Sequence, residues 1–221
     1  MNIDIITLFP EAFIGPLSSS ILKRAQEKRR LVISTHNLRK WTIDKRGTVD
    51  DRPYGGGPGM ILMVEPIDKA ISELRTKDSY IIFVDPSGKK FNQRLAGQLA
   101  LKKHLIFVCG HYEGIDERAK TSFAHEIISI GDYILTGGEL PTMVIVDSVV
   151  RLMPGVLNKE ESTREESFNN NLLEYPQYTR PETYKNMRVP KVLVSGHHGE
   201  IEKWRKKQSM VKTKKNRPDL L

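Results

Sequence analysis

Short apolar segments alternate with helix-like segments along much of the chain, and this alternation constrains the fold more than any other feature of the sequence. Strands joined through helices pair in parallel, because each connection must cross back to the starting edge of the sheet. The predicted strands lie at 2–9, 31–35, 80–84, 105–109 and 125–130. The predicted helices lie at 16–25, 65–74, 92–101, 115–123 and from 139 onward. The sequence therefore predicts an α/β fold with a mostly parallel sheet.

Three of these strands are followed by segments rich in Gly, Pro and polar residues: DPSG at 85–88, GHYEG at 110–114 and SIGDYILTGGELP at 129–141. Open α/β sheets bind ligands at the carboxyl ends of their strands. In the third segment, glycines at 137 and 138 let the backbone approach a ligand closely, because they have no Cβ. We therefore expect one pocket that suits a ligand with many polar edges, such as a nucleoside. A purely structural strand–turn–helix connection at 129–141 is the alternative.

Residues 42–60 interrupt the alternation with TIDKRGTVDDRPYGGGPGM. The glycine run excludes regular structure there, and long glycine loops of this kind commonly bind ligand or substrate. The segment matches neither the phosphate-binding P-loop, GxxxxGK(S/T), nor the GxGxxG pattern of dinucleotide sites. We predict a binding loop, with a flexible surface loop as the alternative.

Composition limits the number of domains and the cellular compartment that the chain fits. The 221 residues are 38% hydrophobic, which is enough for one large domain or a medium domain with a small one. One cysteine, Cys109, allows neither an internal disulfide nor a cysteine-rich zinc site, which fits a reducing cytoplasm. No apolar run approaches the roughly 18 residues of a membrane span. The sequence therefore predicts a cytoplasmic protein with no membrane partner.

The net charge of +8 is concentrated near the C-terminus. Residues 171–221 contain twelve Lys and Arg against five Asp and Glu, a net charge of +7, which leaves +1 for the first 170 residues. A basic helix predicted at 200–215 carries Trp204 among its cations, and RNA or DNA is the natural partner of such a surface. A basic tail that only aids solubility is the alternative. His197 and His198 lack a third metal ligand nearby, so no metal site is expected.

Several longer motifs carry a family resemblance. They are GGGPGM at 55–60, DPSG at 85–88, CGHYEGIDER at 109–118, SIGDYILTGGELP at 129–141, RLMPGVL at 151–157, YPQYTRP at 175–181 and SGHHGEIEKWR at 195–205. In this order and spacing the chain resembles the bacterial tRNA (guanine-N1)-methyltransferases. The resemblance implies a SPOUT-type α/β fold with a deep trefoil knot and a small helical C-terminal domain. It also implies tRNA as partner, and a homodimer whose active site is shared between protomers.

The resemblance implies S-adenosylmethionine as cofactor, with a requirement for Mg²⁺ as a further prediction. The cofactor residues it implies are Val84, Asp85, Pro86, Gly110, Tyr112, Glu113, Gly114, Ser129, Ile130, Gly131, Asp132, Tyr133, Ile134, Leu135, Gly137, Gly138 and Pro141. The substrate residues that we expect are Gly59, Glu113, Ser167, Lys203, Arg205 and Lys206.

Methylation of guanine N1 needs a base for the N1 proton and a cation or donor near O6. Glu166 stands before Ser167-Phe168, where the family usually has an aspartate, and the resemblance makes it the base. Arg151 matches the family's active-site arginine; a helix-capping role is its alternative. His111 occupies a position where an arginine is common.

The expected domains are a knotted methyltransferase domain at 1–157, a flexible linker at 158–171 and a basic, mostly helical tRNA-binding domain at 172–221. The expected reaction transfers a methyl group from S-adenosylmethionine to N1 of the guanine just 3′ of the anticodon. Two other functions fit the same residues: a SPOUT enzyme that methylates another base or a ribose 2′-hydroxyl, and a non-catalytic RNA-binding protein.

Overall fold

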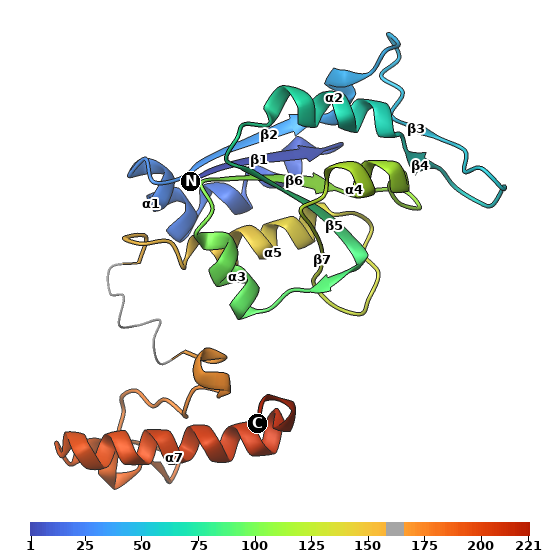
Figure 1. The fold of residues 1–221 in the computed structure, drawn as a ribbon. Helices are drawn as coiled ribbons and strands as arrows, with labels where there is room; N and C mark the ends of the chain where they lie inside the picture. Colours follow the sequence, from blue (N-terminus) through green and yellow to red (C-terminus); the bar gives the residue numbers. More distant parts are fainter. Residues whose placement is uncertain (158–165) are drawn as a thin grey trace. The chain divides into compact units, whose positions relative to one another are not determined.

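A computed structural model describes residues 1–157 and 166–221 of the chain (Figure 1). The chain forms two compact units, Met1–Asn158 and Lys159–Leu221. The first eight residues of the predicted linker at 158–171 lie outside the described part of the chain, so the flexibility of the linker stays a prediction. No helix within the described ranges is both long and apolar enough to cross a membrane.

The first unit is built on a five-stranded parallel sheet with the order β2-β1-β6-β5-β7. Its strands are β1 (Asn2–Thr7), β2 (Val32–Asn37), β5 (Ser79–Lys90), β6 (His104–Cys109) and β7 (Glu126–Ser129). Its helices are α1 (Ser20–Glu27), α2 (Val64–Leu74), α3 (Gln93–Ala100), α4 (Glu117–Phe123) and α5 (Glu139–Val150). The predicted α/β class and the mostly parallel sheet are confirmed.

The sheet is covered by helices on both faces, with α2 and α4 on one side and α1, α3 and α5 on the other (Figure 1). Successive residues of each strand point to opposite faces, so one strand supplies both cores. In β6, for example, Leu105 and Phe107 pack toward α5, while Ile106 and Val108 pack toward α2. Strands buried on both faces read as continuous apolar runs, which is why the sequence revealed them.

The predicted end of the strand at 80–84 is wrong. β5 does not stop at Val84 but continues to Lys90, with an irregularity between Val84 and Lys89 where DPSG bulges out of the ladder. β7 pairs with β5 on both sides of this bulge, at Val84↔Ile128 and again at Lys89↔Ile128. β7 itself ends at Ser129, one residue before the predicted end. The DPSG segment is therefore fixed at both ends by sheet hydrogen bonds.

The glycine-rich segment is flanked by a small antiparallel pair, β3 (Asp50–Asp51) and β4 (Ile61–Leu62). The expectation of no regular structure in 42–60 is therefore wrong at β3, although residues 52–60 contain neither helix nor strand. Gly55, Gly56, Gly57 and Gly59 all have positive φ, a conformation in which other residues are strained.

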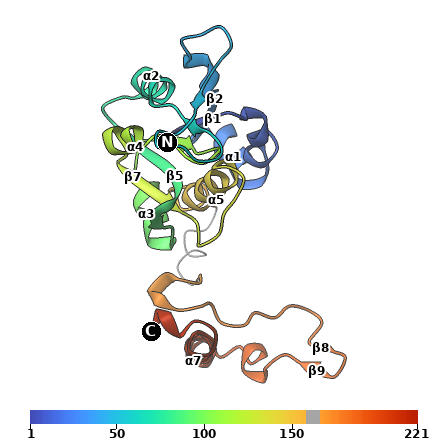
Figure 2. The ribbon, with the colours of Figure 1, turned by 90° about the vertical axis from the view of Figure 1, so that its right-hand side faces the viewer.

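The second unit, within its described residues 166–221, contains a short hairpin, one long helix and three short 3-10 helices (Figure 2). The hairpin pairs β8 (Thr183–Tyr184) with β9 (Met187–Arg188), and α7 runs from His198 to Asn216. α7 contains the basic helix that the sequence predicted at 200–215. The sequence analysis did not predict the hairpin.

Candidate functional site

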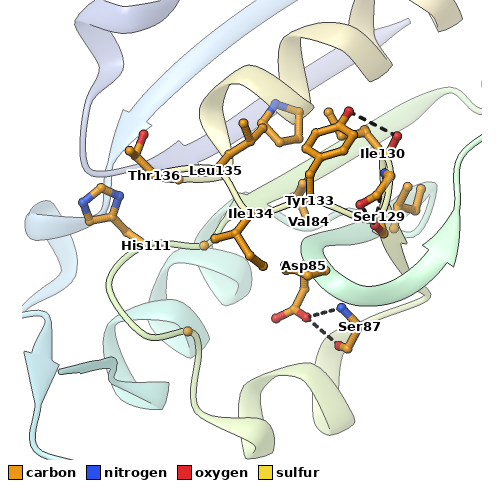
Figure 3. A pocket seen from close by; sticks show the side chains of 18 of the residues that line it. Val84, Asp85, Ser87, His111, Ser129, Ile130, Tyr133, Ile134, Leu135 and Thr136 are labelled. Carbon is orange, nitrogen blue, oxygen red and sulfur yellow. Dashed lines mark hydrogen bonds between the residues drawn. The ribbon is translucent and has the colours of Figure 1, made fainter. Parts of the chain in front are cut away.

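A cavity of about 520 Å³ lies at the carboxyl ends of β5, β6 and β7 in the first unit (Figure 3). All three segments that follow or interrupt these strands contribute to it. The lining residues are Val84, Asp85, Pro86, Ser87, Gly110, His111, Tyr112, Glu113, Gly114, Ile128, Ser129, Ile130, Gly131, Tyr133, Ile134, Leu135, Thr136, Gly137, Gly138 and Pro141. The structure thus brings together every predicted cofactor residue except Asp132, whose exposed carboxylate pairs with Lys90 at 2.9 Å.

The turn at Thr136–Gly138 packs directly against the end of β6. The Gly138 N–H donates to the Gly110 carbonyl at 2.8 Å. A Cβ on Gly138 would lie 2.7 Å from the Gly110 nitrogen and 2.8 Å from the Cys109 Cα, so only glycine permits this approach. The wall of the cavity at this point is therefore backbone, which offers N–H and C=O groups to a ligand.

α5 begins at the cavity wall with a buried carboxylate. Glu139 is 8% exposed, and its Oε1 accepts a hydrogen bond of 2.6 Å from the Thr7 hydroxyl at the end of β1. Burial, and then the nearby Glu139 carboxylate, raise the pKa of the Cys109 thiol, so this cysteine stays protonated and unreactive. The Thr7–Glu139 hydrogen bond thus connects the end of the third cavity segment to strand β1 of the sheet.

Apolar side chains form the open side of the cavity. Tyr133, Ile134 and Leu135 are 56%, 81% and 38% exposed, which is unusual for three consecutive large apolar residues. Figure 3 shows Tyr133 beside Val84, with Ile134 and Leu135 farther along the same loop. The Tyr133 hydroxyl donates to the Ile130 carbonyl at 3.4 Å, which turns the ring back toward its own loop. The arrangement suits a flat, partly apolar ligand held between backbone and side chains.

The glycine-rich loop lies against the second cavity segment. The Glu113 N–H donates to the Met60 carbonyl at 3.0 Å, and Leu62 donates to the Gly114 carbonyl at 3.0 Å. Gly59 has φ +76°, and a Cβ on it would come within 2.3 Å of the Glu113 side chain. Two of the predicted substrate residues, Gly59 and Glu113, are therefore neighbours, and Glu113 lines the cavity.

Sequence reasoning did not assign four of the lining residues to the cofactor: Ser87, His111, Ile128 and Thr136. Ser87 lies inside the motif DPSG and Thr136 inside SIGDYILTGGELP. The assignment of the neighbouring motif residues to the cofactor could therefore have identified these two as well. His111 packs its ring on Phe9 at 5.0 Å, and its Nδ1 is buried without a hydrogen-bond partner. Ile128 belongs to a buried strand, and no feature of the sequence distinguishes it from core.

The two predicted catalytic residues, Arg151 and Glu166, lie outside the three cavity segments in the sequence. Arg151 follows α5 directly, twelve residues after Glu139, and at 1.5 Å per residue it is about 18 Å from the cavity end of that helix. Glu166 and Ser167 belong to the second unit, where the Ser167 hydroxyl accepts a hydrogen bond from the Glu174 N–H at 3.0 Å. The roles of both catalytic residues stay predictions.

The predicted RNA-binding cations lie on α7. Lys203 pairs with Glu200 at 2.9 Å, and the Arg205 guanidinium stacks on the Tyr175 ring at 4.7 Å. Lys206 is exposed on the same helix. Within the described ranges, no group of three or more His, Cys, Asp or Glu side chains could hold a metal ion.

Comparison with known proteins gives concordant matches over the whole chain. The family model described as tRNA (Guanine-1)-methyltransferase TrmD matches residues 1–221. A protein of Carboxydothermus hydrogenoformans is 57% identical over 221 residues, which are all of this chain and 87% of the relative. Proteins of Dictyoglomus turgidum and Bacillus subtilis are 56% and 53% identical, again over all of this chain and over 90% and 92% of the relatives. All three carry the name tRNA (guanine-N(1)-)-methyltransferase.

Proposed function

The chain belongs to the tRNA (guanine-1)-methyltransferase family and methylates N1 of guanine in tRNA; we propose that S-adenosylmethionine is its methyl donor and that the guanine just 3′ of the anticodon is its target. The observation that carries this proposal is the cavity where the segments at β5, β6 and β7 meet. Its backbone wall and its exposed apolar rim suit the polar edges and flat faces of an adenosine group.

The cavity residues fit the proposed cofactor. Close backbone packing at Gly138 and Gly110 leaves peptide groups, rather than side chains, to hydrogen-bond the edge of an adenine ring. Tyr133, Ile134 and Leu135 supply apolar surface for its faces. When bound, the cofactor supplies a methyl group on a cationic sulfonium, which is a strong electrophile. The protein holds that group still and keeps water away from it.

Glu166 is the proposed base. The Glu166 carboxylate would accept the N1 proton as guanine N1 takes the methyl group that bound S-adenosylmethionine would supply. Arg151 is proposed to stabilise the negative charge that develops on O6 as the proton leaves. Glutamate retains the carboxylate of the family's usual aspartate on a side chain that is one methylene longer.

The position of Arg151 supports a site shared between two copies of the chain. Arg151 is about 18 Å from the cavity end of its own helix, too far for its side chain to reach the methyl group bound there. The outer face of α5 exposes Leu140 at 58% and Val144 at 47%, and Val144 with Met143 lines an apolar groove. We propose that a second copy covers this face, so that Arg151 and Glu166 act at the partner's cavity.

The knot that the resemblance implies is also part of the proposal. After edge strand β7, the chain returns to the middle of the sheet, where Gly138 bonds to Gly110 and α5 packs beneath β6. This return path is compatible with threading through the loop after β6. Together with the second unit as a tRNA-binding domain, it completes the proposed SPOUT architecture.

The test is incubation of unmodified tRNA with methyl-labelled S-adenosylmethionine, followed by nuclease digestion and mass mapping of the methylated nucleoside. The proposal requires the label at N1 of the guanine 3′ of the anticodon. Label on a ribose or on another position would support a different RNA methyltransferase. Failure to bind S-adenosylmethionine in calorimetry would support a non-catalytic RNA-binding protein. The same assay with chelator tests the predicted need for Mg²⁺.

The variant Glu166→Gln tests the base. Its methylation rate should fall by about 10²–10⁴-fold, the usual contribution of a general base. Its affinity for S-adenosylhomocysteine should stay within about twofold of wild type, because Glu166 does not belong to the cavity segments. Arg151→Ala should lose activity while circular dichroism shows an unchanged fold. Normal turnover by Glu166→Gln would remove Glu166 from this role.

A further inference from the structure

Asp85 is the carboxylate of the DPSG bulge that lines the cavity (Figure 3). Its side chain is only 15% exposed. Oδ1 accepts hydrogen bonds from the Ser87 N–H at 2.8 Å and the Ser87 hydroxyl at 2.5 Å. Oδ2 has a single long contact, 3.4 Å to the Lys120 ammonium. A carboxylate offers about four acceptor positions, so Oδ2 retains capacity for a donor from the cavity.

Lys120 reaches this carboxylate from α4. Its side chain is only 11% exposed, and its ammonium also contacts Glu117 at 2.8 Å. The Glu117 side chain is 74% exposed, so water screens that shorter pair. Both side chains of the Asp85–Lys120 pair are largely shielded from water. Removal of Lys120 should therefore affect Asp85 more than Glu117, although the Lys120–Asp85 distance is the longer of the two.

The charges of this pair are well defined. Burial alone would raise the pKa of the Asp85 carboxyl, but the two bonds from Ser87 and the Lys120 charge outweigh it and hold that pKa below its usual range. Burial alone would lower the pKa of Lys120, but Glu117 and Asp85 raise it above its ordinary value. Near neutral pH a partly buried anion and a partly buried cation therefore stand beside each other at the cavity. Such a pair rarely adds net stability, which points to a role in the site.

We propose that Lys120 is a positioning residue, which holds the Asp85 carboxylate so that its Oδ2 accepts a hydrogen bond from a hydroxyl or ammonium group of the nucleoside cofactor. The inference rests on the proposed function, because it assumes an adenosine-containing ligand in this cavity. Lys120 does not line the cavity and acts through Asp85. Without Lys120, only the two Ser87 bonds to Oδ1 remain, so the carboxylate can turn about Oδ1 and Oδ2 loses the position that the ligand needs.

The test is calorimetric binding of S-adenosylhomocysteine and S-adenosylmethionine to the full chain. Lys120→Met should weaken both by about tenfold, the size of one hydrogen bond to a charged group. Lys120→Arg, which keeps the charge, should restore affinity to within about threefold of wild type. 5′-Methylthioadenosine has the ribose hydroxyls but no ammonium group. An equal loss with this ligand identifies a hydroxyl as the donor, and an unchanged affinity identifies the ammonium.

Two controls separate positioning from a general charge effect. Lys89→Met removes a cation from the same bulge, where Lys89 is 62% exposed and pairs with Glu126 at 3.3 Å; its affinities should change by less than about twofold. A pure charge effect of Lys120→Met would strengthen binding of cationic S-adenosylmethionine and leave neutral S-adenosylhomocysteine unchanged, and that result would overturn the proposal.

A double-variant cycle tests whether Lys120 acts through Asp85. On an Asp85→Asn background, Lys120→Met should weaken binding by less than about twofold, because the group it positions is gone. The same tenfold loss on both backgrounds would overturn the proposal. If the wild type binds no S-adenosylhomocysteine, the proposed function itself fails. If it binds and Lys120→Met binds equally well, only the positioning role fails.

Discussion

The two units of this chain are stabilised in different ways. In residues 1–157, two apolar clusters fill both faces of the sheet and contain large side chains that are fully buried, such as Phe83 and Phe107. Among the described residues 166–221, no apolar side chain is fully buried, and the buried residues are Ser209 and Thr213. The first unit thus relies on burial of apolar surface, whereas the second relies on polar contacts.

The contacts of the second unit involve cations and aromatic rings. Arg205 stacks on Tyr175, the Arg217 guanidinium lies 5.7 Å from the Phe168 ring, and Tyr178 packs near Trp204. Twelve Lys and Arg stand against six Asp and Glu in residues 166–221. A unit with this charge and little apolar core has low stability by itself and gains stability when a polyanion binds. The cofactor cavity is therefore built on two packed apolar clusters, whereas the proposed RNA surface lies on a unit whose described residues contain no fully buried apolar side chain.

The largest expected effect is on the core of the first unit. Phe107→Ala should lower the free energy of unfolding by about 3–5 kcal/mol, because it removes a fully buried ring in the central strand and leaves a cavity. Guanidinium unfolding, monitored by near-ultraviolet circular dichroism, measures this change in the free energy of unfolding. Leu101→Ala, at a position 82% exposed, is the control and should change stability by less than about 0.5 kcal/mol. Equal effects of the two substitutions would contradict the view that burial of apolar side chains stabilises the first unit.

The difference between the units also decides what the sequence could predict. Strands such as β1 and β6 are buried on both faces, so their apolar runs and the breakers around them were sufficient. DPSG was misread as a strand end because Pro, Ser and Gly are local breakers, whereas the pairing of β7 across the bulge is a long-range property. The hairpin at 183–188 was missed because Lys185 and Asn186 occupy its positive-φ turn in place of the usual Asn-Gly signal.

The site was predictable where its residues lie next to one another in the sequence. The cavity segments were found because each is a contiguous motif at the end of a strand. Contacts between distant residues left no local signal: Thr7 with Glu139, and Lys120 with Asp85, are joined only by the folded sheet. No amphipathic pattern or spacing rule brings such pairs together before the topology is known.

The next effect concerns a polar network inside the first unit. Asp4 accepts hydrogen bonds from His36 at 2.6 Å and His104 at 2.7 Å, and it joins strands β1, β2 and β6. Burial would raise the pKa of Asp4, but the two histidines outweigh it and lower that pKa below 3.8. The stabilisation is therefore fully present above the ordinary pKa and is lost as the pH falls through the folded pKa.

Asp4→Asn should accordingly lower the free energy of unfolding by about 1–2 kcal/mol at pH 7. The difference between variant and wild type should shrink as the pH falls below about 4, where Asp4 becomes protonated. Urea unfolding at a series of pH values measures this. A difference that is constant down to pH 3 would show that the charge of Asp4 contributes nothing.

A smaller effect is expected in the second unit. The Thr213 hydroxyl is fully buried, donates to the Ser209 carbonyl at 2.7 Å and accepts from the Leu173 N–H at 2.8 Å. Thr213→Val keeps the shape and removes both bonds, so it should destabilise this unit by about 1 kcal/mol. Hydrogen exchange of the α7 amides should become faster, while the amides of β6 keep their protection. Faster exchange in both units would show that they unfold together, against the comparison above.

The smallest effect concerns the RNA surface itself. Lys206→Ala should weaken tRNA binding only a few-fold, but it should reduce the slope of log affinity against log salt by about 0.7–0.9, the contribution of one phosphate contact. Filter binding at a series of salt concentrations between about 50 and 200 mM measures the slope. Lys77→Ala, an exposed cation of the first unit, is the matched control and should leave the slope unchanged. Binding of S-adenosylhomocysteine should be nearly independent of salt, because this ligand carries no net charge and displaces no counterions from a polyanion. A salt slope that falls equally in both lysine variants would assign phosphate binding to both units and would remove the functional difference between them.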